Sequence, residues 1–354
     1  MFDNLDLWDI KVGDNIKKYP KQFHNAVKMR LEQQKYIFGE EKTTLNKFRT
    51  LLNKSANDIN PELFCNEIEK LFLLIKNIKI IIKTPKQLRK EGLNLILSVD
   101  NLTSRMLIVE YVGNKSSKIH DLVIVGKGVT FDSGGYSLKN RKSMYGMHLD
   151  KTGGVMALYI LHELAKNKYK KNIVVCVPLV QNSVSHNATK PGDIITSYSG
   201  IKVEITNTDA EGRLILADSI SYCLDKYKPK IIIDMGTLVG IDQCKMSYAY
   251  YTLSNKLKLE LNKVAKKYGE NILELAIDKE YIKYTKSTRG DIKNAFFGCS
   301  EKMLVSLFLL NFIPKKYYYK WIHINLNDIT IKKDLAILEG SYSIMDFIKK
   351  IQTT

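Results

Sequence analysis

The stretch NIVVCVPLV at residues 172–180 decides the fold class of this chain. It is a nearly unbroken apolar run, without the alternation of polar and apolar positions that marks a strand with one solvated face. The run IIID at residues 231–234 has the same character. Such runs are typical of strands in the interior of a parallel sheet, because helices cover both of its faces.

Helical and strand-like segments alternate outward from this stretch. Strands are expected at 106–113 (MLIVEYVG), 122–128 (LVIVGKG), 201–206 (IKVEIT) and 230–240 (KIIIDMGTLVG), and helices at 156–167 (MALYILHELAKN) and 213–227 (RLILADSISYCLDKY). Upstream, Asn60-Pro61 predicts the start of an amphipathic helix, since proline suits a first helical turn. The alternation predicts an α/β fold, a mostly parallel central sheet flanked by helices on both faces. Ligands of such sheets bind at the carboxyl ends of the strands.

Composition bounds the class of protein. The 354 residues carry 55 Lys and Arg against 37 Asp and Glu, a formal charge of +18, with 45% hydrophobic residues. This hydrophobic content excludes a disordered chain and suffices for one large domain with a small appendage. The charge is spread along the chain, +5 over residues 1–100, +6 over 101–240 and +7 over 241–354. Because no block of like charges stands out, a nucleic-acid partner is not expected.

Cysteine usage and the N-terminus indicate the compartment. The five cysteines are odd in number and include no CxxC pair: Cys65, Cys176, Cys223, Cys244 and Cys299. That usage favours a reducing environment, and Cys176 and Cys223 fall on apolar faces expected in the core. The N-terminus lacks an apolar signal core, and no run approaches the roughly 18 apolar residues of a membrane span. We therefore expect a cytoplasmic protein without a membrane partner.

Three segments carry the candidate chemistry: VGKGVTFDSGGYSLK (125–139), MYGMHLDKTGG (144–154) and NTDAEGRLILADS (207–219). They place charged residues just after strands or just before helices, namely Lys127, Asp132, Lys139, Asp150, Asp209, Glu211 and Arg213. Four carboxylates in one place repel each other unless cations lie between them, and two divalent ions would neutralise them. Asp209 and Glu211 point the same way if their segment is extended, because they are two residues apart.

Other sites are less favoured. The chain has no GxxxxGK[ST] motif, so a nucleotide site is not expected. Only His148 of the six histidines lies inside a motif, so metal ligation through histidine is not expected either. Asp218 and Asp234, on a helix face and at a strand end, are interpreted as structural.

These residues resemble the leucyl aminopeptidase family, the dizinc cytosol aminopeptidases. Gly126 to Lys139 match the pattern GKG-x-TFDSGG-x-S-x-K, Met147 to Asp150 match M-x-x-D, and Asn207 to Leu214 match NTDAEGRL without a substitution. The resemblance covers about residues 45–354 and implies a zinc-exopeptidase-like catalytic domain there. Residues 1–44 are expected to form a short helical extension, a remnant of the family's N-terminal domain.

The resemblance also implies roles for individual residues. Lys127, Asp132, Asp150 and Glu211 would hold the tighter of two divalent ions, Zn²⁺ or Mn²⁺, and Asp132, Asp209 and Glu211 the looser one. Lys139 would stabilise the oxyanion, and Arg213 would hold a bicarbonate general base with the backbones of Gly212 and Leu238. Met147, Asn207 and Thr237 correspond to substrate-binding positions. Peptides with Leu-like N-terminal residues are the implied substrates, and a homohexamer is the implied assembly.

Several positions depart from the family pattern. Lys151 stands where the family usually has Met, which would weaken metal affinity or leave the lysine in solvent, and His148 replaces a common lysine. Near the C-terminus, Asn325 replaces Asp, Asp328 replaces Gly, and LEGSYSI replaces the ATGFGVR loop. These changes and the charge of +18 motivate an alternative, a catalytically degenerate member that acts as a binding or structural protein, including DNA binding. All five metal-ligand positions are retained, so the peptidase is the favoured hypothesis.

Overall fold

The structure is a computed structural model that describes residues 43–240, 247–275, 279–296, 301–326, 336 and 338–351. The predicted extension over 1–44 therefore lies almost wholly outside the described residues. The longer helices are α2 (Thr44–Asn53), α3 (Pro61–Phe72), α7 (Thr152–Lys166), α8 (Glu211–Tyr227), α9 (Asn255–Tyr268), α10 (Glu301–Leu310) and α11 (Ser341–Ile351). The shorter ones are α4 (Pro85–Glu91), α5 (Asn94–Val99), α6 (Arg141–Met144), η4 (Met147–Leu149), η5 (Lys279–Thr285) and η6 (Lys315–Lys320).

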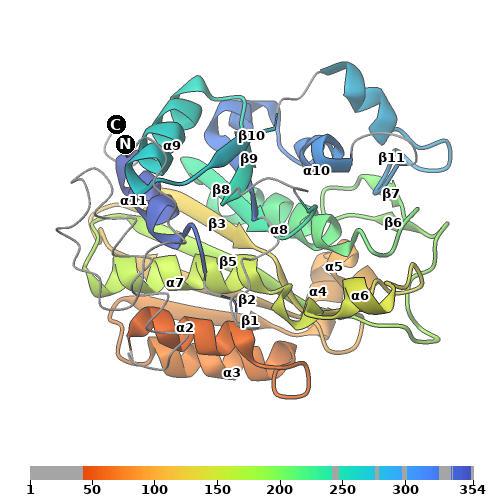
Figure 1. Cartoon of the computed structure of the whole chain (residues 1–354), viewed down its shortest axis with the longest axis horizontal. Coiled ribbons are helices and arrows are strands. Elements are labelled where there is room, and N and C mark those ends of the chain that lie inside the picture. The colour runs from red at the N-terminus through yellow and green to blue at the C-terminus, as the bar shows by residue number, and fades with distance from the viewer. Residues whose placement is uncertain are drawn as a thin grey trace, which may run out of the picture.

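The central sheet has nine strands, ordered β1-β2-β5-β3-β8-β12-β9-β10, with β4 also paired to β5 (Figure 1). Their bounds are β1 (Ile78–Lys83), β2 (Arg105–Val112), β3 (Leu122–Gly126), β4 (Gly128–Asp132), β5 (Asn172–Asn182), β8 (Ile231–Gly236), β9 (Tyr248–Tyr251), β10 (Ile272–Glu274) and β12 (Trp321–Leu326). The inner strands β5, β3, β8 and β12 are parallel, as predicted. Antiparallel pairings join β2 to β1 and β5, and β9 to β12.

A second, three-stranded sheet lies beside the first. It is ordered β11-β7-β6 and consists of β6 (Ile194–Thr196), β7 (Lys202–Glu204) and β11 (Ile292–Lys293). The predicted strand at 201–206 is β7, so it exists but does not belong to the central sheet. Its role is to lead the chain into the turn before α8.

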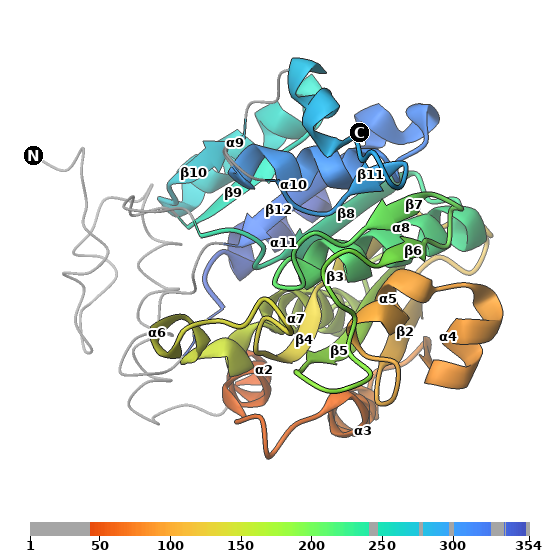
Figure 2. The same cartoon turned by 90° about the vertical axis from the view of Figure 1, so that its right-hand side faces the viewer.

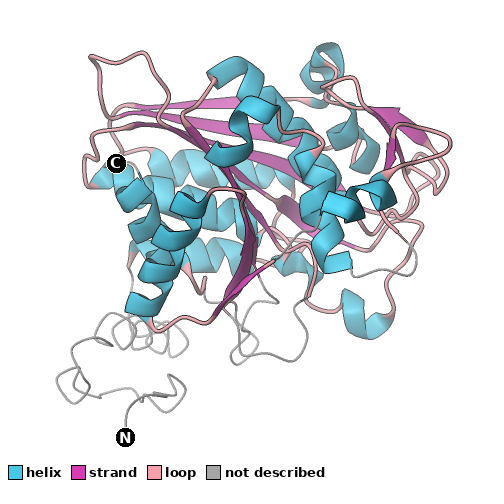
Figure 3. Ribbon diagram, turned by 90° about the horizontal axis from the view of Figure 1, so that it is seen from above, coloured by secondary structure: helices cyan, strands magenta, loops and turns pink. Residues whose placement is uncertain are grey.

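Helices cover both faces of the central sheet, which confirms the predicted fold class (Figures 2 and 3). Alternate residues of one strand enter opposite cores: Leu122 and Ile124 of β3 pack on the face covered by α7, and Val123 and Val125 on the face covered by α8. All four are fully buried. The apolar run at 172–180 is likewise buried on both faces of β5.

Helix boundaries follow local signals. Asn60 caps α3 by accepting a hydrogen bond from the Leu63 N–H, and Pro61 occupies the first turn as predicted. Helix α7 begins at Thr152, four residues before the predicted start, and it includes Gly153 and Gly154. A side chain at Gly153 would lie 2.4 Å from the Met235 carbonyl oxygen, so the glycine pair lets α7 start against the sheet. No described helix has the length and apolar character needed to cross a membrane.

Candidate metal and catalytic site

Lys127 lies at the centre of the site, where the carboxyl end of β3 meets β8. Its Nζ is 2.8 Å from Asp150 Oδ2 and 2.9 Å from Glu211 Oε1, and it donates to the Thr237 carbonyl at 2.8 Å. The side chain is 4% exposed. Burial opposes its charge, but the surrounding carboxylates outweigh burial and hold the pKa of Lys127 above its usual value. Without metal, Lys127 is thus a buried ammonium between two acids.

The two carboxyls beside Lys127 also have raised pKa values, which for an acid favours the neutral form. Burial raises the pKa of Glu211 to about 8, helped by the charge of Asp132 and opposed by Lys127. Burial also raises the pKa of Asp150 to about 6, while Lys127 opposes the rise. Thr237 Oγ1 donates to Asp150 Oδ1 at 2.6 Å and orients that carboxyl. The site therefore holds more acidic groups than its own cations stabilise.

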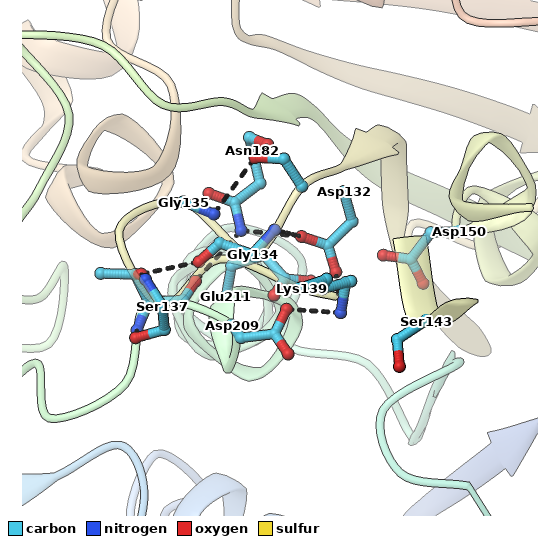
Figure 4. A network of polar contacts seen from close by, with 12 residues as sticks. Asp132, Gly134, Gly135, Ser137, Lys139, Ser143, Asp150, Asn182, Asp209 and Glu211 are labelled. Atoms are coloured by element: carbon cyan, nitrogen blue, oxygen red, sulfur yellow. Dashed lines mark hydrogen bonds and ion pairs between the residues drawn. The ribbon is translucent and has the colours of Figure 1, made fainter. Parts of the chain in front are cut away.

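Asp132 ends β4 and is held by a tight loop. Its Oδ1 accepts from the Gly134 N–H at 2.9 Å and from Asn182 Nδ2 at 2.8 Å, which leaves Oδ2 directed toward Lys139 at 2.9 Å (Figure 4). Gly134 has φ +86°, and a side chain there would meet the Ser137 carbonyl at 2.5 Å. The glycine is required because the loop folds back on itself.

Lys139 bridges two of the acids. It forms ion pairs with Asp132 Oδ2 and with Asp209 Oδ1, and its side chain is 13% exposed (Figure 4). Burial opposes its charge, yet the two carboxylates raise its pKa above the usual lysine value. Lys139 is therefore a cation at the edge of the acidic cluster, partly open to solvent.

The turn that carries Asp209 is fixed by Asn294, a residue that the sequence reasoning missed. Asn294 is fully buried; its Oδ1 accepts from the backbone N–H of Thr206 and Asn207, and its Nδ2 donates to the Asn207 carbonyl at 2.7 Å. Its own backbone carbonyl accepts from Arg213 Nη1 at 2.6 Å. No motif surrounds Asn294 in the sequence, so only the contacts identify it.

Asn182 was also missed, although it carries a recognisable signal. It is the first buried polar residue after the apolar run of β5, at the carboxyl end of that strand. Its Nδ2 links Asp132 to the Thr208 carbonyl at 3.0 Å, so it ties the first candidate segment to the third.

The first turn of α8 packs directly on Lys127 because residue 212 is glycine. A side chain at Gly212 would lie 2.6 Å from both Lys127 Cε and Leu238 Cδ2. Gly212, Arg213 and Leu238, the predicted bicarbonate positions, are therefore neighbours. Arg213 is 3% exposed.

The predicted substrate positions surround this cluster. Met147 begins η4, the turn that ends at Asp150, and is half-buried. Thr237 follows β8 and contacts both Asp150 and Lys127. The Asn207 side chain accepts from the Asp209 N–H at 2.8 Å and so shapes the turn that presents Asp209.

The donor set fits divalent cations. Asp132, Asp209 and Glu211 each offer a carboxylate oxygen, and these oxygens lie within 4.8 Å of one another. Glu211 Oε2 is buried and accepts no hydrogen bond from the described residues, and Asp150 Oδ2 faces Lys127. Hard divalent ions prefer such oxygen ligands, and buried acids without partners are costly unless a cation joins them.

Lys151 points neither to solvent nor into the acidic cluster, so the second of the two alternatives for this residue, a lysine in solvent, is wrong. It is completely buried, and its Nζ donates to the carbonyls of His148 and Lys54, the latter at 3.2 Å. Burial lowers the pKa of Lys151 to about 7, although Asp150 opposes this shift. Lys151 thus ties the Asp150 turn to the end of α2.

Asn325 holds the turn after β8. Its Oδ1 accepts from the N–H of Leu238 at 3.1 Å and of Val239 at 3.4 Å, and its Nδ2 donates to the Val239 carbonyl at 2.8 Å. The amide thus serves as both donor and acceptor, which a carboxylate at this position cannot do. Asp328 lies outside the described residues. The altered loop at 338–344 is described: it turns at Gly340, which has φ +84°, and continues into α11 from Ser341.

The residues interpreted as structural are placed away from the cluster. Asp218 accepts from the N–H of Leu95 and Tyr198, and Asp234 pairs with His323 and accepts from the Trp321 indole. Cys176 and Cys223 are buried core thiols, as predicted, and Cys65 is buried as well.

Comparison with known proteins supplies the family. Residues 46–340 match the model of the cytosol aminopeptidase family, catalytic domain. A "Probable cytosol aminopeptidase" of Phytoplasma mali is 33% identical over 305 residues, which are 84% of this chain and 60% of the relative. The chain thus spans less than two thirds of that relative's length.

Solved structures share the fold. Caenorhabditis elegans leucine aminopeptidase matches with TM-score 0.79 and 25% identity, over 92% of this chain and 67% of that one. The bottromycin maturation enzyme BotP in complex with Mn matches with TM-score 0.80 and 20% identity, over 92% of this chain and 73% of that one.

Proposed function

The chain belongs to the cytosol aminopeptidase family, and on that premise we propose that it is a metal-dependent aminopeptidase. It would release Leu-like N-terminal residues from peptides. One observation carries the proposal: three distant segments bring five residues into one cluster, with Lys139 at its edge. They are the buried Lys127, Asp132, Asp150 and Glu211 and the half-buried Asp209. The degenerate alternative predicts a lost or scattered ligand set, whereas this chain retains and gathers all five positions.

We further propose that the cluster holds two divalent ions, Zn²⁺ or Mn²⁺. Mn is present in the BotP structure, whose fold this chain shares. Lys127, Asp132, Asp150 and Glu211 would hold one ion, and Asp132, Asp209 and Glu211 the other. When bound, the ions supply positive charge that polarises the scissile carbonyl and activates water for attack.

Lys127 must change its protonation state to serve as a ligand. In the metal-free site it is an ammonium paired with Asp150 and Glu211. An amine can coordinate only through its lone pair, so Lys127 would release its proton when divalent charge replaces the ion pair. Thr237 keeps Asp150 oriented during the exchange through its 2.6 Å hydrogen bond.

Lys139 and Arg213 are the proposed catalytic residues. Once cations satisfy Asp132 and Asp209, the Lys139 ammonium is free to donate to the oxygen of the scissile carbonyl as negative charge develops there. Arg213, with the backbones of Gly212 and Leu238, would bind bicarbonate, which supplies a proton acceptor. Met147, Asn207 and Thr237 would line the substrate pocket.

The wider context is also proposed. We expect residues 45–354 to act as the catalytic domain, the assembly to be a homohexamer, and the compartment to be the cytoplasm. Sedimentation of the purified protein tests the assembly, and a monomer would contradict the expectation.

The activity test uses protein loaded with Zn²⁺, Mn²⁺ or Co²⁺ and a leucine amide substrate. Bestatin-sensitive release of leucine supports the proposal, and its absence under all three metals rejects it. Glu211→Gln and Asp209→Asn should lose metal, measured by elemental analysis, together with activity. Glu260→Gln is the matched control, because its carboxylate forms a surface pair with Lys263 on α9.

A further inference from the structure

One edge of the central sheet lies opposite the edge that carries the site. It is formed by the amino ends of β1, β5, β3, β8 and β12 and by the carboxyl end of β2, and is called the amino edge. In the order of the sheet, β1, β2, β5, β3, β8 and β12 reach this edge at residues 78, 112, 172, 122, 231 and 321. Strands β3 and β8 run from left to right in Figure 1, so this edge lies on the left, away from α6. Six adjacent strands give an edge about 24 Å long.

The loops at this edge contact each other in sequence along it. The Val112 N–H donates to the Asn77 carbonyl at 3.0 Å, which joins the first loop to the second. A side chain at Gly113 would lie 2.5 Å from the Lys171 carbonyl, which joins the second to the third. Lys230 Nζ pairs with Asp121 at 2.9 Å, and the rings of His120 and Tyr227 are 5.0 Å apart.

These loops concentrate positive charge that the sequence spreads over the whole chain. The amino-edge surface is defined as residues 73–77, 113–121, 163–172, 225–231 and 314–321. It contains three carboxylates and thirteen lysines, namely Lys76, Lys115, Lys118, Lys166, Lys168, Lys170, Lys171, Lys226, Lys228, Lys230, Lys315, Lys316 and Lys320. All except the half-buried Lys171 are exposed. Two of the carboxylates, Asp121 and Asp225, already pair with Lys230 and Lys226.

Exposed apolar side chains lie among these lysines. Leu73 is 79% exposed and Leu74 is 89% exposed, in the turn between α3 and β1. Ile119 is 52% exposed between Lys118 and His120, and Tyr319 is 71% exposed beside Lys320. Leucine side chains this exposed contribute no hydrophobic stabilisation to the fold, and they would gain it if a binding partner covered them.

We propose that the amino-edge surface docks on the surface of an anionic lipid bilayer. The lysines would approach the headgroups, and Leu73, Leu74, Ile119 and Tyr319 would enter the boundary of the acyl region. Peripheral membrane surfaces combine these two features, basic charge and protruding apolar groups. A nucleic-acid backbone would use the lysines alone and would gain nothing from two exposed leucines, so the lipid surface is favoured.

Docking at the amino edge would leave the acidic cluster accessible. The acidic cluster lies at the carboxyl ends of β3 and β8, so docking by the amino edge leaves the site facing away from the bilayer. A docked molecule keeps access to peptides in solution. The inference does not depend on the proposed peptidase activity, because the site contributes no residue to this surface.

Cosedimentation of the full chain with vesicles tests the proposal. Vesicles of equal parts phosphatidylcholine and phosphatidylglycerol should bind at least about tenfold more protein than pure phosphatidylcholine vesicles at low salt. Lys168→Glu combined with Lys228→Glu should reduce binding about tenfold or more, because both lysines are exposed on the amino-edge surface and each change reverses one charge. Leu73→Ser combined with Leu74→Ser should reduce it about tenfold at unchanged net charge.

Matched controls come from the opposite edge. Leu102→Ser removes a leucine that is 70% exposed there, and Lys86→Glu with Lys90→Glu reverses two exposed lysines of α4. Both control variants should bind vesicles like the parent, and the unfolding midpoint of every variant verifies that it is folded. The proposal is overturned if the protein ignores anionic vesicles, or if the leucine pair has no effect while duplex DNA binds more tightly than the vesicles.

Discussion

Lys127 Nζ lies 2.9 Å from Glu211 Oε1, so a lysine at the end of β3 and a glutamate in the first turn of α8 form a buried ion pair inside the acidic cluster. Metal binding must break this pair. Lys127, Glu211 and Asp150 all have raised pKa values and all must be deprotonated to ligate. We therefore predict net proton release on metal binding, with affinity at least about tenfold weaker near pH 6 than near pH 8.

Calorimetric titration of Zn²⁺ or Mn²⁺ in buffers of different ionisation enthalpy measures that release. Lys127→Met should bind metal more weakly and release fewer protons. An affinity that stays constant across this pH range would show that the ion pair does not control metal entry.

Lys139→Met should lower turnover of a leucine amide about 100-fold or more, because it removes a donor to the developing oxyanion. Metal content should stay near that of the parent, since Asp132 and Asp209 remain. Lys142→Met, a change at an exposed lysine of α6, is the control. Full activity in the Lys139 variant would remove it from the catalytic assignment.

Gly212→Ala tests the close approach of α8 to Lys127. The added methyl group would lie 2.6 Å from both Lys127 Cε and Leu238 Cδ2. We expect weaker metal binding and reduced turnover, with a loss of stability of about 1–3 kcal/mol from overpacking. Ser219→Ala, farther along α8, should leave metal affinity unchanged. Equal metal affinity in both variants would mean that the first turn of α8 tolerates displacement.

Asn294→Ala should destabilise the protein by about 2–4 kcal/mol, because three partly buried backbone groups of Thr206 and Asn207 lose their partner. Asn294→Asp keeps the acceptor oxygen but loses the donor, so it should recover part of the stability. Urea unfolding measures both. Since the turn presents Asp209, metal affinity should fall in the same order, and an unchanged affinity would limit Asn294 to a role in folding.

Glu270 gives the protein a pH-dependent stability away from the metal site. Burial raises its pKa to about 8, while Ser343 and Tyr248 oppose the shift. The folded state therefore holds a proton that the unfolded state has lost above its ordinary pKa, so stability declines as pH rises from about 4.5 towards 8. Glu270→Gln should gain about 1–2 kcal/mol relative to the parent between about pH 6 and pH 9. A constant difference in urea unfolding over that range would rule out this titration.

Much of the fold can be predicted from local patterns in the sequence. The apolar runs at 172–180 and 231–234 predict dry strands, because only strands covered on both faces lack polar positions. The pairing partners of the strands could not be predicted in the same way. Strand β2 is antiparallel to β5, and β7 belongs to the small sheet. Strand direction and sheet membership depend on distant partners, which a local apolar run does not specify.

By itself, the sequence determined the α/β class and identified the candidate metal-ligating residues, because apolar runs and motifs such as NTDAEGRL are local properties. Tertiary structure alone decided that Asn182 and Asn294 hold the site, that Lys151 is buried, and that lysines spread along the chain meet at one edge. These are contacts between residues far apart in the chain, and folding creates them by bringing the ends of neighbouring strands together.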